Sequence, residues 1–316
     1  MSSTRRTGEL TSALDEAVAA QDGPPALRGE RAAASGERAI RAAARVLAAD
    51  TLPDRWASAA IMLQQPVATG RRIAVLSPAG GVGRSALVAA MARELRAFRS
   101  DVVARLDLAD HASGQAGTTP DPAPTPRTAW AALRDQRPET RLDFLRILAD
   151  PDTGHVDVHT APPEPALDAE DVVQLLAEVS RHSAVTLVEC PAGHTDPRTR
   201  AAVSTAHALV VVGRQDRASV RAVVEYAADL REAYPRTPVL AVANGRDRVG
   251  APWHGGLTRS VAERALAWTA VGHSRVLRRG PRPEAVLEDE RRLEVMHTAA
   301  VALTLARGLP SAEATA

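Results

Sequence analysis

From position 71 onward, the apolar residues of this chain follow two alternating spacings. Short apolar runs such as RRIAVL and AVTLVE are typical of buried strands. Between the runs lie segments such as SALVAAMARELRAF, in which Leu87, Met91 and Leu95 recur at the spacing of one helical face. Strands that alternate with helices in this way predict an α/β fold with a doubly wound, mostly parallel sheet.

The same pattern predicts the order of the elements. Strands are expected in the apolar runs at 71–78, 101–110, 155–161, 184–190, 206–213, 238–245 and 267–272. Helices are expected at 85–98, 129–150, 168–182, 217–234 and 288–306. A break at Arg137–Pro138 is expected within the second helix, because proline disfavours helical backbone at the residue before it. The alternation continues throughout, so residues 71–308 are expected to form one domain.

Three stretches differ from this periodic pattern. Residues 1–70 are rich in Ala, Arg and Glu and carry no strand signal, so we expect a helical, partly disordered N-terminal arm. Within it, Ser35 is a candidate helix cap. Residues 111–127 are rich in Pro, Gly and Thr and predict a disordered loop, and residues 309–316 form a short tail.

The composition of the chain limits the classes of function that it can have. The chain has 316 residues and a formal net charge of +1, so bulk charge does not indicate a nucleic-acid or acidic partner. Cys190 is its single cysteine, which excludes an intrachain disulfide. No apolar run approaches the ~20 residues that span a bilayer, and the N-terminus lacks a signal-peptide pattern. We therefore expect a cytoplasmic protein.

Polar residues and glycines follow several expected strands at the point where each strand ends. The loop SPAGGVGRSAL at 77–87 follows the first strand, and Asp107, Glu189 and Asn244 end later ones. The carboxyl ends of parallel strands meet at one edge of a sheet, so these groups are expected to converge. Taken singly, each has a simpler explanation, because glycines serve the turn and polar groups commonly end strands.

Two segments resemble the MinD/ParA family of P-loop ATPases. PAGGVGRSA, at 78–86, lies over that family's deviant Walker A loop, x-K-G-G-x-G-K-[ST]-T. ECPAGHTD, at 189–196, lies over its switch segment, D-x-P-P-G-x-x-D. The resemblance extends over about residues 70–308, and RELRAFRSDVVARLDLAD is similar to the EspI-like branch associated with actinobacterial type VII secretion. It implies a P-loop fold that binds ATP and Mg²⁺.

The resemblance also implies roles for residues by their position. The residues that would hold the ATP phosphates are Gly80, Gly81, Val82, Gly83, Arg84 and Ser85. Ser85 and Glu189 take the place of the Mg²⁺-binding residues, and Asp107 and Glu189 take the place of the catalytic acids. Gly193 matches the glycine that meets the terminal phosphate, and Asn244 matches the asparagine that contacts the base.

Departures from the family pattern bear on activity. The chain contains no lysine: Arg84 replaces the phosphate-binding lysine, and Ala79 replaces the signature lysine that reaches the partner's phosphate in a sandwich dimer. Glu189 replaces an aspartate, and Pro78 removes a backbone donor. Compositional drift toward arginine accounts for the origin of Arg84, but a planar guanidinium does not reproduce a lysine ammonium. Because phosphoryl transfer depends on positioning and electrostatics, hydrolysis is expected to suffer more than binding.

Three functions remain open on this basis. The first is a degenerate nucleotide-binding regulator or scaffold of a secretion or positioning system, with a protein partner and a homodimer as candidate assemblies. The second is an active ATPase in which Arg84 serves in place of lysine. The third is a ParA-type DNA-binding partition factor. Its basic cluster would be Arg275, Arg278, Arg279 and Arg282, although a solvated surface is the simpler explanation.

One further group has the spacing of metal ligands. His155, Asp157 and His159 alternate along an expected strand, which places them on one face. The sequence nominates no additional ligand, so a structural role is the simpler explanation.

Overall fold

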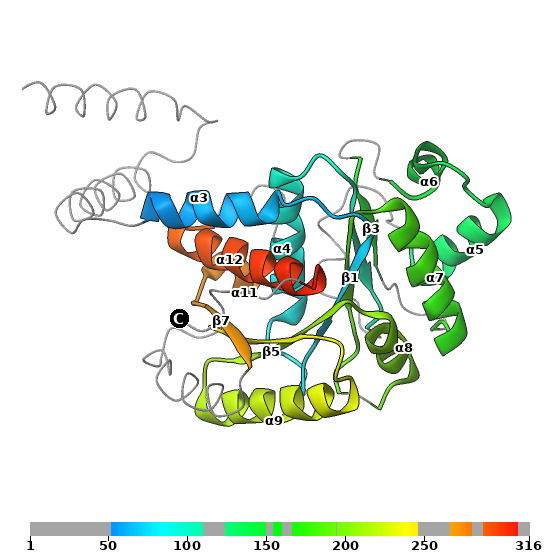
Figure 1. Ribbon diagram of the computed structural model, residues 1–316. Coiled ribbons are helices and arrows are strands. Elements are labelled where there is room, and N and C mark those ends of the chain that lie inside the picture. Colours follow the sequence, from blue (N-terminus) through cyan, green and yellow to red (C-terminus); the bar gives the residue numbers. More distant parts are fainter. Residues whose placement is uncertain are drawn as a thin grey trace, which may run out of the picture. The chain divides into compact units, whose positions relative to one another are not determined.

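The computed structural model describes residues 52–109, 124–149, 154–159, 166–193, 195–245, 266–279 and 287–308. A seven-stranded sheet has the order β3-β2-β4-β1-β5-β6-β7 (Figure 1). The strands are β1 Arg71–Leu76, β2 Val103–Asp107, β3 Val156–Val158, β4 Val185–Glu189, β5 Ala208–Arg214, β6 Val239–Asn244 and β7 Ala267–Val271. All neighbouring strands in this sheet pair in parallel. The predicted α/β class and doubly wound sheet are confirmed.

Helices cover both faces of the sheet. Their bounds are α3 Leu52–Leu63, α4 Arg84–Phe98, α5 Pro126–Gln136, α6 Arg141–Leu148, α7 Ala169–His182, α8 Pro197–Thr205, α9 Arg217–Ala233, α11 Arg275–Arg279 and α12 Asp289–Ala306. Helices α4 and α12 pack on one face, with α11 against α4, whereas α7, α8 and α9 pack on the other (Figure 1). Helix α5 contacts α7, and α6 contacts the edge strand β3.

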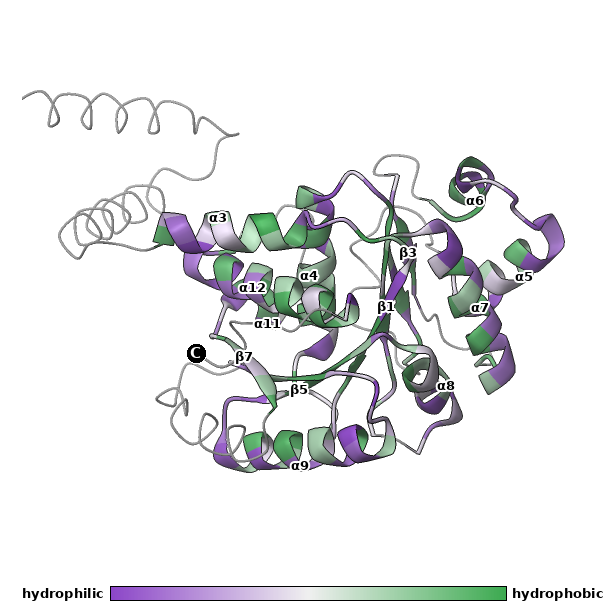
Figure 2. Cartoon of the chain, viewed as in Figure 1, coloured by the Kyte–Doolittle hydropathy of each residue, from purple (hydrophilic) through white to green (hydrophobic). Residues whose placement is uncertain are grey.

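Burial on both faces explains why the strands are almost continuously apolar. Every residue of β2, β4 and β6 is buried, including the polar ends Asp107, Glu189 and Asn244. Helix α9 shows the matching helical pattern, with an apolar stripe and a hydrophilic one (Figure 2). A buried polar group is costly without a hydrogen-bond partner. The partners of these three strand-end side chains therefore indicate what the residues do.

The chain connections diverge at the carboxyl ends of two central strands. Strand β1 leads into α4 on one face of the sheet, whereas its neighbour β4 leads into α8 on the other. Ligands of open α/β sheets bind at such topological switch points. In this chain, the loop after β1 carries the glycines and Glu189 ends β4.

Most of the expected elements are present. Each apolar run expected as a strand contains one, and the helical segment around 129–150 breaks at Arg137, which has a left-handed φ of 44°. The end of the expected loop at 111–127 is wrong, because Thr125 forms a reciprocal capping box with Thr128 and starts α5. Residues 111–123 lie outside the described residues.

Helix α3 lies within the stretch at 1–70 that was expected to be an arm, and it packs on the domain. Leu63 is fully buried. The Arg99 Nη1 atom, just after α4, donates to the Leu63 carbonyl at 2.7 Å. The Arg292 guanidinium of α12 lies 5.1 Å from the Trp56 ring centroid. From Asp54 onward, α3 belongs to the same compact unit as the sheet.

Two expectations fall outside the part of the chain that the structure describes: the helix capped by Ser35 and the tail at 309–316. Helices α8 and α11 were not expected, although Asp196–Pro197 is a recognisable start signal for α8. Among the described helices, none is both long and apolar enough to cross a bilayer.

Candidate functional site

The loop from Ser77 to Gly83 joins the end of β1 to the start of α4. Gly81 and Gly83 have φ angles of 73° and 83°, in the left-handed region that glycine adopts without strain. Gly83 is the N-cap residue of α4, and it has no side chain with which to cap the helix. The first-turn N–H groups and the positive end of the helix dipole therefore face the loop, where they favour an anion.

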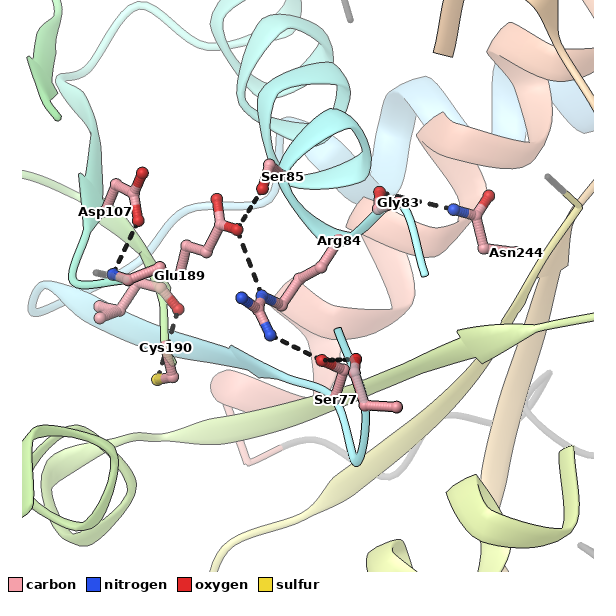
Figure 3. Close-up of polar contacts among 11 residues, drawn as sticks. Ser77, Gly83, Arg84, Ser85, Asp107, Glu189, Cys190 and Asn244 are labelled. Carbon is pink, nitrogen blue, oxygen red and sulfur yellow. Dashed lines mark hydrogen bonds and ion pairs between the residues drawn. The ribbon is translucent and has the colours of Figure 1, made fainter. Parts of the chain in front are cut away.

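Asn244, at the end of β6, is anchored to this loop. Its Nδ2 donates to the Val82 carbonyl at 3.0 Å and lies 3.5 Å from the Gly83 carbonyl (Figure 3). A Cβ added at Gly83 would lie 2.6 Å from the same nitrogen. The Asn244 side chain is buried, and its Oδ1 has no hydrogen-bond partner within the described ranges. A buried amide oxygen of this kind is suited to accept a hydrogen bond from a ligand donor, such as an exocyclic amine.

The Arg84 side chain is held between two strand ends. Its Nη1 donates to Ser77 Oγ at 2.6 Å, and its Nε donates to Glu189 Oε1 at 3.2 Å (Figure 3). Ser77 Oγ in turn donates to the Ala79 carbonyl at 2.8 Å. Only 11% of the Arg84 side chain is exposed, compared with 5% for Glu189. The guanidinium at the position that the resemblance assigns to a phosphate-binding lysine is therefore hydrogen-bonded to side chains of the protein itself.

The Ser85 hydroxyl donates to the same Glu189 oxygen that accepts from Arg84 (Figure 3). Register explains how Glu189 reaches them, because it pairs with Val75 of β1, two residues before the loop starts at Ser77. The two residues that the resemblance assigns to Mg²⁺ thus bond directly to each other.

Asp107 lies next to Glu189 in the register of β2 and β4. Its Oδ1 accepts from the Ala109 N–H at 2.9 Å, and the Leu108 N–H donates to the Glu189 carbonyl at 2.8 Å. The structure therefore places both candidate catalytic acids side by side at one edge of the sheet.

The segment after β4 folds back onto the start of the glycine loop. Gly193 has a left-handed φ of 80°, and its N–H donates to the Ser77 carbonyl at 2.9 Å. This N–H is the one that the resemblance assigns to a terminal phosphate. Burial raises the pKa of the neighbouring Cys190 to about 12, so the thiol stays protonated and unreactive at neutral pH.

Arg198 is a structural part of this edge that the sequence did not reveal. Its Nη2 pairs with Asp196 Oδ2 at 2.6 Å, and its Nη1 donates to the Leu108 carbonyl at 3.1 Å. The hydrogen bonds from Arg198 hold the pKa of Asp196 below its usual value, although partial burial opposes them. Arg198 thereby links the segments that follow β2 and β4.

The structure brings all the predicted site positions to this edge. Glu189 contacts Arg84 and Ser85, and Asn244 contacts Val82. An added Cβ at Gly80 would meet nothing within 4 Å, so Gly80 lies at an open part of the loop.

The alternating group on β3 is surrounded by arginines. Asp157 accepts from Arg96 at 2.7 Å and from Arg105 at 2.8 Å. Burial would raise the pKa of Asp157, but the two arginines lower it to about 2. Burial and Arg105 lower the pKa of His159 to about 4. No cluster of three metal-ligating side chains occurs within the described ranges, and the fixed cations oppose a metal at this one.

The predicted basic cluster is only partly described. Arg275 and Arg278 of α11 are exposed, which agrees with a solvated surface, whereas Arg282 lies outside the described residues.

The residues present fit a nucleotide better than they fit Mg²⁺. The left-handed glycines, the uncapped start of α4 and the Asn244 oxygen suit a phosphate chain and a base. The Glu189 carboxylate instead has its charge matched by Arg84 and accepts the Ser85 hydrogen. A divalent cation at this position would have to compete with a fixed guanidinium.

No protein-family model matches the sequence, and neither does any curated protein sequence. Solved structures do match the fold. The ParA family ATPase from Chlorobium tepidum has a TM-score of 0.54 at 14% identity, covering 65% of this chain and 85% of its own. The cell division ATPase MinD from Pyrococcus furiosus has a TM-score of 0.54 at 15% identity, covering 74% and 99%.

A third structure, MinD from Pyrococcus horikoshii in complex with Mg-ADP, has a TM-score of 0.53 at 15% identity, covering 72% of this chain and 93% of its own. At such identities the likeness concerns the fold. The chain therefore adopts the P-loop fold of the MinD/ParA ATPases.

Proposed function

We propose that this chain is a nucleotide-binding regulator or scaffold that binds ATP weakly and hydrolyses it negligibly. Binding is supported by the glycine loop, by the uncapped N-terminus of α4 and by the buried acceptor oxygen of Asn244. It is supported further by the fold, since the similar Pyrococcus horikoshii MinD structure holds Mg-ADP. Asn244 Oδ1 would accept from the 6-amine of adenine, whereas guanine carries a carbonyl at position 6 and its amine at position 2.

The observation that carries the proposal is the engagement of the Arg84 guanidinium. To approach a phosphate, this group must leave its bonds to Ser77 and Glu189, which lie at 2.6 and 3.2 Å. Hydrogen bonds to charged groups stabilise a fold by about 1.5 to 3 kcal/mol each, so part of the binding energy is offset. We expect dissociation constants of about 1 μM or weaker, or roughly −8 kcal/mol or less favourable.

ATP hydrolysis depends more strictly than ATP binding on where the positively charged side chains lie. It requires positive charge at the transferring phosphoryl group throughout the reaction. Arg84 is tied to the strand ends, and Ala79 offers no cation to a partner subunit in a sandwich dimer. ATP is accordingly not expected to drive a catalytically coupled homodimer.

The partner is proposed to be a protein of a secretion or positioning system. This assignment is supported by the similarity of the segment at 93–110 to the EspI-like branch. Genes for type VII secretion components beside this one would support it, and a partition locus with a centromere-like repeat would instead support DNA binding.

Steady-state ATPase measurements test the proposed function. The wild-type chain is expected to show no turnover above background, whereas Ala79→Lys/Arg84→Lys should gain activity because both cations are restored. Arg221→Lys is the matched control, because this side chain is 82% exposed on α9, where it pairs with Glu225.

Wild-type turnover that Arg84→Ala abolishes would overturn the proposal. It would show that the arginine leaves its framework contacts and clamps the phosphate, as in an active ATPase.

A further inference from the structure

Arg84, Glu189 and Ser85 form one bonded group at the place where a P-loop site holds its metal. Glu189 Oε1 accepts from Arg84 Nε at 3.2 Å and also from the Ser85 hydroxyl. We propose that the Arg84 guanidinium acts as a built-in cation, so that nucleotide binding by this chain is independent of Mg²⁺. This inference rests on the proposed function, because it concerns the same site.

Glu189 Oε1 and Ser85 Oγ, which a metal would need as ligands, already take part in hydrogen bonds. Divalent cations such as Mg²⁺ need negatively charged or neutral oxygen ligands in a strict geometry. One Glu189 oxygen already accepts two hydrogen bonds, and one comes from a group that is permanently charged. A metal bound by Ser85 and Glu189 would therefore share the Glu189 oxygen with the Arg84 guanidinium.

The Arg84–Glu189 pair is also largely buried. The Arg84 and Glu189 side chains are 11% and 5% exposed, so water screens their charges poorly. Repulsion between the guanidinium and a divalent cation is therefore stronger than it would be at a surface. Ser77 Oγ holds the Arg84 Nη1 at 2.6 Å from the far side, which restricts its movement away.

Negative charge on the β4 segment is already balanced by arginines. Two acids on the β4 segment each have an arginine partner: Glu189 pairs with Arg84, and Asp196 pairs with Arg198 at 2.6 Å. Matched pairs attract a divalent cation less than bare carboxylates do. The Arg84 guanidinium instead supplies a fixed positive charge beside the glycine loop while it stays bonded to Ser77 and Glu189.

Calorimetric titration of the full chain with ADP tests the inference, in buffers containing either excess Mg²⁺ or excess EDTA. The wild-type affinity is expected to differ by less than about twofold between the two buffers. Arg84→Ala removes the internal cation and releases Glu189, so its affinity is expected to rise about tenfold or more when Mg²⁺ replaces EDTA.

Two further variants separate a structural from an electrostatic effect. Glu189→Gln keeps an acceptor for the Ser85 hydroxyl but removes the charge, and it should stay insensitive to Mg²⁺. Arg221→Lys, far from the loop on the α9 surface, should behave as the wild type. Circular dichroism and thermal melts verify that each variant is folded.

Wild-type affinity that rises about tenfold with Mg²⁺, and loses this response in Glu189→Gln, would overturn the inference while leaving the proposed function intact. Failure of ADP and of ATP to bind the folded wild type in either buffer would overturn the proposed function, and this inference with it.

Discussion

At Gly83, the chain combines a left-handed backbone with a close neighbour. The φ angle is 83°, and an added Cβ would lie 2.6 Å from the Asn244 Nδ2 atom. Either feature disfavours a side chain. Gly83 therefore allows the β6 end to approach the start of α4, and the nucleotide-binding geometry depends on it.

We predict that Gly83→Ala lowers the free energy of unfolding by about 1 to 3 kcal/mol, because it forces alanine into the left-handed region and displaces Asn244. Urea denaturation measures this change. Gly80→Ala is the control, since Gly80 has no left-handed φ and no neighbour within 4 Å of an added Cβ. Its effect should stay within about 0.5 kcal/mol, and equal losses in the two variants would contradict the prediction.

The two contacts made at position 84 suit an arginine side chain better than a lysine side chain. The guanidinium uses Nε toward Glu189 and Nη1 toward Ser77 at the same time. A lysine ammonium is a compact charge and does not present this rigid fork. The replacement thus changes what the side chain can bind, in addition to its length.

Three helices on the α4 face of the sheet are connected by an ion pair and a cation–π contact that share one arginine. Glu94 of α4 is 1% exposed, and both its carboxylate oxygens accept from the Arg292 Nε of α12, at 3.0 and 2.9 Å. The same guanidinium lies over the Trp56 ring of α3. Because α4 starts at the glycine loop, this contact connects α3 to the helix that carries the candidate site (Figure 1).

We predict that Arg292→Ala leaves Glu94 buried without its main cation and lowers the free energy of unfolding. Loss of one partner from a fully buried pair costs about 3 to 5 kcal/mol. The Arg292 side chain is 32% exposed, so water compensates in part and we expect about 2 kcal/mol.

Guanidinium chloride denaturation at neutral pH checks this value. Arg221→Ala, which removes an exposed pair with Glu225, should change the stability by less than about 0.5 kcal/mol. A loss in Arg292→Ala no larger than in this control would show that α3 and α12 are held by apolar contacts alone.

At the scale of the whole molecule, His207 and His159 are the described histidines whose pKa values are lowered most, and they make stability depend on pH. Burial also lowers the pKa of His155. Burial, followed by the charges of Arg72 and Arg71, lowers the pKa of His207 from 6.5 to about 4. Burial and Arg105 lower the pKa of His159 from 6.5 to about 4. His207 Nδ1 accepts from the Arg72 N–H at 3.0 Å, and His159 Nε2 lies 2.6 Å from Arg105 Nη2. Both contacts require a neutral imidazole.

The direction of the effect follows from proton uptake. Between pH 6.5 and 4 the unfolded chain protonates these imidazoles and the folded chain does not. Their contribution to stability is therefore complete above pH 6.5 and is lost as the pH falls toward 4. The lowered pKa of Asp157, about 2, extends the loss to more acidic conditions.

We predict that His207→Asn/His159→Gln flattens the stability profile between pH 6.5 and 4. The side-chain amides keep an acceptor near each contact but do not take up a proton. Chemical denaturation across this range measures the slope, and the variant should match the wild type most closely above pH 6.5. An unchanged slope would show that other groups dominate the acid response.

The sequence by itself determined the order of strands and helices and the convergence of polar groups at one edge. These features are local or follow from topology: apolar spacing specifies strands and helices, and parallel strands bring their carboxyl ends together. The sequence alone therefore places Asp107, Glu189 and Asn244 near the loop. Asp196–Pro197 is a local sequence signal for the start of α8 as well.

Only the tertiary structure decided what the side chains of that edge bind. Arg84 and Glu189 are 105 positions apart, and whether the guanidinium turns to the loop or to the strand end depends on packing around both. The same holds for Arg292 and Glu94, which are 198 positions apart. Sequence spacing carries no information on such pairs, because side-chain direction and burial are set by the elements that assemble around them.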